Sequence, residues 1–159
     1  VQIGKGCDIH PTAYIENSVV GDGVEIGARS VIRGSMILDK SIISNNCTVA
    51  YSVLGEECQL RDGVNVTYSL LFPGAFTTCS FLNSSVMGRN SFLPVCSVLT
   101  DFRFDGRCVT VIKNGKIVNS GQRFLGCCLG HGAYVAAGIT IPPGREISNG
   151  ARLLPSKGE

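Results

Sequence analysis

The feature that most constrains this 159-residue chain is a repeat of 17 residues. Within each repeat the aliphatic positions are separated by six, six and five residues, as at Val20, Ile26, Ile32 and then Ile37. This period is neither a helical heptad nor the length of one strand with its turn, so the repeating unit is larger than either. Three consecutive copies are SVVGDGVEIGARSVIRG (18–34), SMILDKSIISNNCTVAY (35–51) and SVLGEECQLRDGVNVTY (52–68).

A small or apolar residue stands four positions after most of these aliphatic anchors, as Ser30 and Cys47 do. Because alternate residues of a strand share one face, the anchor and the residue four positions later both point inward, on either side of a corner. Three short strands then close one triangular coil, and each 17-residue coil stacks on the last. The pattern predicts an all-β parallel β-helix of about seven coils, formed by residues 1–99 and 124–149 of a single domain spanning 1–159.

The rhythm stops after Leu99 and resumes at Phe124, which leaves residues 100–123 as an arm inserted into one side of the prism. Inside the arm, two β-rich runs flank Asn114-Gly115 in VTVIKNGKIV, a strong signal for a β-hairpin. The hairpin is apolar and a lone hairpin is marginally stable, so we expect the arm to pack against a neighbouring subunit or domain. Residues 150–159 are expected to form a C-terminal tail.

The eight cysteines include no C-x-x-C pair, which argues against a zinc site. We expect the cysteines to be reduced and mostly buried and the protein to be cytoplasmic. Cys128 is expected in the buried slot four residues after Phe124. Two histidines cannot supply a three-histidine metal site, and no metal is expected. A net charge of +2 and apolar runs of four or five residues favour neither nucleic acid nor a membrane as a partner.

Five serines recur in register near one corner, and stacking explains them better than catalysis does. We expect a ladder of hydroxyl groups there, formed by Ser18, Ser35, Ser52, Ser69 and Ser85. His10, one residue after an anchor in IHPTAYI, is expected to point outward in a structural role.

The repeats resemble the hexapeptide repeats of left-handed parallel β-helix proteins, and NSVV, YSVL and SSVMG resemble the C-terminal domains of sugar-1-phosphate nucleotidyltransferases. The segments FRFDGRCVTVIKNGKIVNSGQRFLGCCLG and GITIPPGREI resemble the arm and last coils of bifunctional enzymes that also acetylate amino-sugar 1-phosphates. The resemblance implies a trimer that binds acetyl-CoA between neighbouring subunits. It assigns nucleotidyl transfer to an N-terminal domain that this sequence does not contain.

The resemblance places Arg103, Asp105 and Arg123 near a bound sugar phosphate, which arginine is suited to hold. An Arg103–Asp105 pair that only fixes the base of the arm is an equally open interpretation. The resemblance also implies cofactor-binding positions in the last coils, namely Ala137, Gly138 and Arg145. The candidate catalytic residue is His131, although LGHGA matches exposed corners of other coils.

Two features of the acetyltransferase site are missing from this sequence. TTCSFLNSSVMG, in the coil before the arm, has no histidine where the family places one, and Pro94-Val95-Cys96 replaces a glycine-rich run. Two hypotheses therefore remain. The first is a β-helix of a sugar-nucleotide enzyme that serves assembly and regulation as a homotrimer or by docking to an N-terminal nucleotidyltransferase domain. The second is a hexapeptide-repeat acetyltransferase that uses acetyl-CoA on an amino-sugar phosphate.

Overall fold

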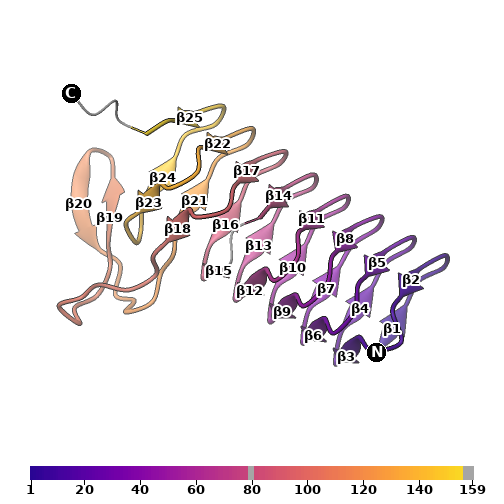
Figure 1. Ribbon diagram of the computed structural model, residues 1–159. Coiled ribbons are helices and arrows are strands. Elements are labelled where there is room, and N and C mark those ends of the chain that lie inside the picture. The colour runs from indigo at the N-terminus through magenta and orange to yellow at the C-terminus, as the bar shows by residue number, and fades with distance from the viewer. Residues whose placement is uncertain (79–80, 156–159) are drawn as a thin grey trace.

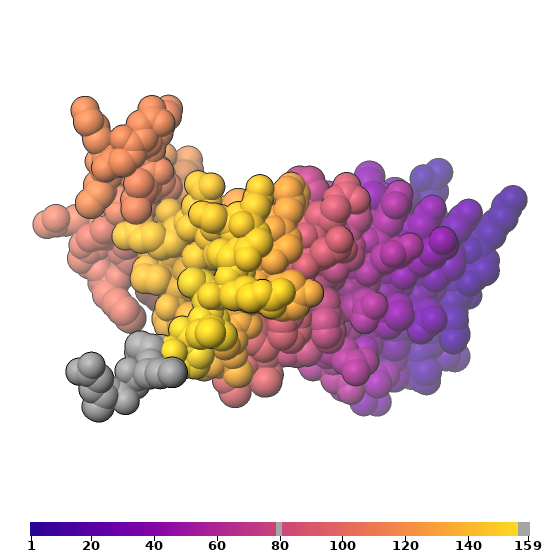
Figure 2. Space-filling view, turned by 90° about the horizontal axis from the view of Figure 1, so that it is seen from above, coloured from indigo at the N-terminus to yellow at the C-terminus, as the bar shows by residue number. Residues whose placement is uncertain are grey.

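The computed structural model describes residues 1–78 and 81–155, and these form a left-handed parallel β-helix with one projecting hairpin (Figure 1). The strands of successive coils lie on three flat faces of a triangular prism. Figure 2 shows the elongated body, with the hairpin arm standing out from its C-terminal end. Among the described residues, no helix is long and apolar enough to span a membrane.

Two faces carry eight parallel strands each. The first face consists of β1 (Gln2–Ile3), β4 (Val19–Val20), β7 (Met36–Ile37), β10 (Val53–Leu54), β13 (Leu70–Leu71), β16 (Val86–Met87), β21 (Cys128–Leu129) and β24 (Glu146–Ile147). The second face consists of β2 (Asp8–Ile9), β5 (Glu25–Ile26), β8 (Ile42–Ile43), β11 (Gln59–Leu60), β14 (Phe76–Thr77), β17 (Phe92–Leu93), β22 (Tyr134–Val135) and β25 (Arg152–Leu153).

The third face is shorter. It consists of β3 (Tyr14–Glu16), β6 (Val31–Arg33), β9 (Thr48–Ala50), β12 (Asn65–Thr67) and β15 (Phe81–Asn83), followed by the pair β18 (Val98–Leu99) and β23 (Thr140–Ile141). The described strands thus make the seven expected coils plus two sides of an eighth. Because β25 pairs with β22, the prism continues to Leu153, past the expected boundary at residue 149.

The aliphatic anchors form the core, as the repeat predicts. Ile26, Ile43 and Leu60 are in register on neighbouring strands and at most 2% exposed. The small residues four positions after the anchors are also inside, with Ser30 and Cys47 at most 1% exposed. One coil is a residue shorter, since Ser69 and Ser85 are 16 residues apart where the other coils repeat at 17.

The serine ladder is confirmed, and its hydrogen bonds run to the backbone instead of from hydroxyl to hydroxyl. The Ser35, Ser52 and Ser69 amides each donate to the Oγ of the serine one coil earlier, at 3.1 Å. Each hydroxyl in turn donates to the carbonyl two residues before it, as Ser52 does to Ala50 at 2.8 Å. The ladder therefore satisfies backbone groups at a corner that strand pairing leaves unbonded.

Candidate functional site

The arm leaves the prism at the corner between the third and first faces and returns to the same corner. It contains a loop and the antiparallel hairpin β19 (Thr110–Lys113) and β20 (Lys116–Asn119), with Ile112 paired to Ile117. Backbone hydrogen bonds close its base, from Leu125 N–H to the Asp101 carbonyl at 2.8 Å and from Val109 N–H to the Gln122 carbonyl at 2.7 Å. The predicted hairpin is confirmed, and it is tied firmly to the coil that bears it.

One side of the arm packs on the last coils of its own chain. Val109 is 0% exposed, and the Arg145 guanidinium donates to the Thr110 carbonyl at 3.1 Å. Gly144, with φ of +69°, allows this approach, because a Cβ there would lie 2.6 Å from the Thr110 carbonyl oxygen. The outer side remains exposed, and Ile117 in particular is 76% exposed.

A hollow of about 480 Å³ lies between the arm and the first face, and we call it the arm pocket. Its walls are mainly apolar and include one guanidinium, that of Arg145, and one carboxylate, that of Glu146. Gly126 and Gly144 line the pocket with backbone atoms, because they have no side chain. The residues that line it are Ser84, Val86, Val111, Ile112, Leu125, Gly126, Cys127, Cys128, Gly144, Arg145, Glu146 and Ser148.

The two adjacent thiols in this pocket are arranged differently from the prediction. Cys128 is exposed and Cys127 is 3% exposed, so Cys127 and not Cys128 occupies the buried slot. The predicted anchor Phe124 is 66% exposed, which is also contrary to expectation. The chain re-enters the prism at a corner, where the Cys127 amide donates to Ser85 Oγ at 3.0 Å and extends the serine ladder. Register after the arm is therefore set by this ladder.

Neither thiol is suited to nucleophilic attack. Burial raises the pKa of the Cys127 thiol to about 11. Burial also raises the pKa of Cys128, and the nearby carboxylate of Glu146 acts in the same direction. Because the thiolate is the nucleophilic form, both groups are protonated and unreactive at neutral pH.

A second hollow, of about 450 Å³, lies on the other side of the arm base and is almost wholly apolar. Phe102 and Phe104 form an edge-to-face pair there at 6.1 Å between ring centroids, opposite Pro142 and Pro143. The Phe104 side chain is fully exposed. The sequence signal for this hollow was the aromatic pair at the root of the arm together with the PPG turn.

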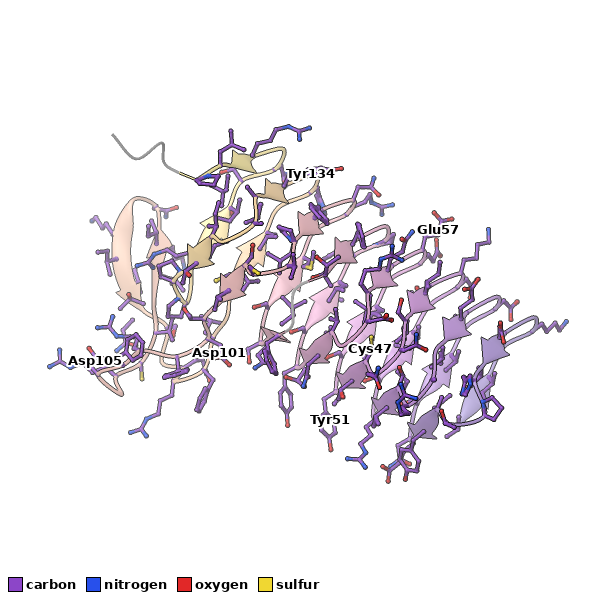
Figure 3. All side chains as sticks on the ribbon, viewed as in Figure 1. Cys47, Tyr51, Glu57, Asp101, Asp105 and Tyr134 are labelled. Atoms are coloured by element: carbon purple, nitrogen blue, oxygen red, sulfur yellow. The ribbon has the colours of Figure 1, made fainter. Side chains whose placement is uncertain are left out.

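The Arg103 and Asp105 side chains bind each other beside the second hollow. Arg103 Nε donates to Asp105 Oδ1 at 3.0 Å, and Nη2 donates to Oδ2 at 2.6 Å. These hydrogen bonds hold the pKa of the Asp105 carboxyl well below its usual range. The ion pair that one of the two open interpretations places at the arm base is present, and the Arg103 guanidinium is directed at the protein's own carboxylate. Figure 3 shows Asp105 on the loop of the arm.

His131 lies at an exposed corner outside the lining of the arm pocket. Its ring Nδ1 accepts a hydrogen bond from the backbone N–H of Arg89 at 2.8 Å, and the backbone N–H of His131 donates to Asn149 Oδ1 at 2.8 Å. Asp22 and Asp39 make the same type of contact in other coils, so the imidazole continues a row of corner-capping side chains. A catalytic role for His131 stays a prediction. His10, also exposed, shares a 2.9 Å hydrogen bond with Thr12 Oγ1.

The positions expected to bind a cofactor do not form one cluster. Arg145 lines the arm pocket, whereas Ala137 and Gly138 form an exposed turn between β22 and β23 at another corner. Arg123 is exposed on the returning segment of the arm. The sequence did not indicate the close contact of Gly144 with Val109 and Thr110, since this contact arises only when the arm folds back.

Comparison with known proteins gives matches that agree with this architecture. A family model described as the EIF2B subunit epsilon LbH domain matches residues 1–75. A bifunctional sugar-1-phosphate nucleotidylyltransferase/acetyltransferase from Sulfurisphaera tokodaii is 29% identical over 106 residues, covering 66% of this chain and 26% of that protein. The bifunctional protein GlmU from Thermodesulfovibrio yellowstonii is 26% identical over 143 residues, covering 88% of this chain and 32% of that protein.

Among solved structures, perosamine N-acetyltransferase from Caulobacter crescentus, in complex with CoA and GDP-perosamine, is similar at a TM-score of 0.45 and 17% identity. That match covers 95% of this chain and 52% of the other. The chain spans about a third or less of the length of the curated relatives it matches.

Proposed function

We propose that this left-handed β-helix, which is related to the C-terminal part of bifunctional sugar-1-phosphate nucleotidyltransferase/acetyltransferases, is an assembly and docking domain of a cytoplasmic sugar-nucleotide enzyme. In this role it binds other protein surfaces and transfers no acetyl group. The partner of the arm is an N-terminal nucleotidyltransferase domain, held against the exposed side of the hairpin.

The observation that carries this proposal is the apolar outer surface of the arm. Phe104 is fully exposed, and Ile117, Ile112 and Phe102 are 76%, 60% and 51% exposed. Exposed apolar patches of this kind mark surfaces that bind another protein. The base of the arm is fixed by backbone hydrogen bonds and by the Arg103–Asp105 pair, so the patch is presented on a rigid support.

The lining of the arm pocket supports the absence of acetyl transfer. Attack of an amine on a thioester requires a base to remove the amine proton. The titratable side chains that line the pocket are Arg145, Glu146 and two protonated thiols, so the pocket offers the carboxylate of Glu146 but no imidazole as a base. The imidazole of His131 stands at the corner, with its Nδ1 already engaged by Arg89.

The arm pocket also favours a second candidate function, which is acetyl transfer to an amino-sugar phosphate. Its apolar walls and the guanidinium of Arg145 fit the chain and a phosphate of acetyl-CoA, with Ser148 beside them. In this alternative the chain is a trimer, and Arg103 and Arg123 face the sugar phosphate in the cleft between subunits.

Titration calorimetry with acetyl-CoA separates the two functions. We expect no heat of binding up to millimolar ligand, because a docking domain has no use for the acetyl donor. Saturable heat, reduced when Arg145 is replaced by alanine, would contradict the docking role and favour the acetyltransferase. Deleting residues 104–121 provides a second comparison, since this deletion lowers the mass of the assembly only if the arm joins subunits, as in the trimer.

A further inference from the structure

The corner between the third and first faces carries one residue from each coil, directly before the serine ladder or its continuation. In the first five of these residues the backbone is left-handed, with φ between 48° and 53°, so their side chains leave the prism in the same direction. Beyond the arm the same position is held by two glycines, because Cys127 extends the ladder and the next strands keep its register. This corner row consists of Asn17, Gly34, Tyr51, Tyr68, Ser84, Gly126 and Gly144.

Two members of the corner row are tyrosines, although a left-handed backbone is unfavourable for bulky residues. The Tyr51 ring lies over Gly34, where a Cβ would come within 2.9 Å of it. Tyr68 stacks on Tyr51 with ring centroids 5.3 Å apart and an interplanar angle of 12°. The two side chains are 59% and 67% exposed, and Figure 3 shows Tyr51 standing out from the corner. An exposed aromatic pair held in a strained backbone conformation indicates a functional surface.

The tyrosine stack is open at the end that faces the arm. Tyr51 covers one face of the Tyr68 ring, so the other face is directed at the next coil, where the corner row holds Ser84 and then Gly126. Both of these small residues line the arm pocket, and the arm itself packs on Gly144. Three coil spacings, about 14 Å, separate Tyr68 from Gly144. The stack therefore ends in a slot between the Tyr68 ring and the arm, which we call the ring slot and which has room for another ring.

The walls of the ring slot suit an uncharged aromatic ring. Val86 and Val111 supply apolar contacts. The guanidinium of Arg145 and the carboxylate of Glu146 together bring no net charge into the pocket, and Arg145 already donates a hydrogen bond to the Thr110 carbonyl. This balance favours a ring without a phosphate group over a nucleotide, because a phosphate would face the carboxylate with a single, partly engaged guanidinium to offset it.

The rim of the ring slot is basic. Lys113 and Lys116 are opposite each other in the hairpin, and both are exposed. They share a face of the hairpin with Val111, which lines the pocket, because alternate residues of a strand point to the same side. Residues 106–126 contain four basic and no acidic residues. A partner segment with acidic side chains is therefore attracted to this rim.

We propose that the ring slot receives an aromatic side chain of a partner protein, from a segment in which acidic residues flank the aromatic one. The inserted ring stacks on Tyr68 above Ser84, and its acidic neighbours face the two lysines of the hairpin. Aromatic side chains seated in pockets carry a large share of the binding energy of protein interfaces. This inference rests on the docking role proposed above and names the contact that anchors the partner.

Fluorescence titration with a synthetic peptide tests the ring slot. The chain contains no tryptophan, so the emission of the peptide acetyl-Glu-Asp-Trp-Asp-Glu-amide can be followed alone. We expect a saturable change in this emission, and none for the basic peptide acetyl-Lys-Lys-Trp-Lys-Lys-amide. Absence of saturable binding up to millimolar protein, or equal binding of the two peptides, would overturn the proposal. Displacement of the acidic peptide by uridine monophosphate would assign the slot to a nucleotide and would overturn it as well.

Ser84→Tyr fills the ring slot from within. The backbone accepts tyrosine there, since φ is +48° at Ser84 and +51° and +49° at Tyr51 and Tyr68. We expect the affinity for the acidic peptide to fall about tenfold or more, with an unchanged circular dichroism spectrum. Tyr68→Ala removes the stacking face and should weaken binding about fivefold. The matched control is Tyr14→Ala, which removes an exposed tyrosine from the third face and should leave the affinity unchanged.

The variants separate this inference from the docking role itself. Unchanged affinity in either Ser84→Tyr or Tyr68→Ala, or an equal loss in Tyr14→Ala, would refute the ring slot. If acetyl-CoA gives no heat and the peptide does not bind, the docking role stands and this anchor is wrong. If acetyl-CoA binds, the docking role is contradicted, whatever the peptide does.

Discussion

Replacing Gly144 by alanine should release the arm from the prism without unfolding it. The new Cβ would lie 2.6 Å from both the Thr110 carbonyl oxygen and Val109 Cγ1. The φ of +69° alone costs an L residue about 1–2 kcal/mol. Because the obstructing atoms belong to backbone and to a fully buried side chain, relief requires the arm to move, which breaks the hydrogen bond from Arg145.

Amide hydrogen exchange measures this release directly. The amides of Val109 and Ser120 are bonded within the arm base, at 2.7 Å and 3.0 Å. We expect both to exchange roughly tenfold faster or more, since each 1.4 kcal/mol of destabilisation changes an opening equilibrium tenfold. Gly138→Ala is the matched control, because its φ is +79° and a Cβ there meets nothing within 4 Å. Equal exchange at the arm base in the two variants would refute the close contact as the reason for glycine.

Three further predictions concern the prism. Ser52→Ala should destabilise the fold by about 1–3 kcal/mol in urea, because the buried amide of Ser69 loses its acceptor. Ile43→Asp should abolish the β-sheet circular dichroism signal, since it buries an unpaired charge in the core. Burial raises the pKa of Cys58 from 9.0 to about 11, so the unfolded chain releases this proton first and stability should fall between pH 9 and 11.

Each of these predictions has a control within the chain. Ser148→Ala changes an exposed serine and should leave the urea midpoint unchanged. Ile42→Asp, on the outward side of the same strand as Ile43, should remain folded. Cys58→Ala should flatten the fall in stability above pH 9, and an equally steep fall in this variant would assign the effect to other groups.

The coils could be predicted from the sequence because the inward or outward direction of each side chain follows from its position within the 17-residue repeat. Anchors such as Ile43 and small residues such as Cys47 recur at fixed spacing, and the stack repeats one geometry. The same rule explains the one-residue-short coil, where Thr77 takes an anchor position and is fully buried. Cys79, in the same coil, lies outside the described residues, so its predicted burial is untested.

The return from the arm could not be predicted in the same way. A pattern interrupted for over twenty residues no longer fixes register, and Phe124 matches an anchor only in its spacing of five residues before Leu129. The register depends instead on a contact distant in sequence, in which the Cys127 amide reaches Ser85 Oγ and Gly126 N–H bonds the Ser84 carbonyl. The folding back of the arm onto Gly144 is likewise a tertiary contact without a periodic signal.

The inserted arm also changes how the molecule would yield to force. Pulling on the two ends of the rod peels away one coil at a time, and a normal coil of 17 residues frees about 60 Å of contour length. Across the arm, neighbouring positions of the ladder are 42 residues apart, so loss of that coil frees about 150 Å. A single-molecule extension trace would therefore show a series of equal short steps interrupted by one step about two and a half times as long, which locates the arm within the order of unfolding.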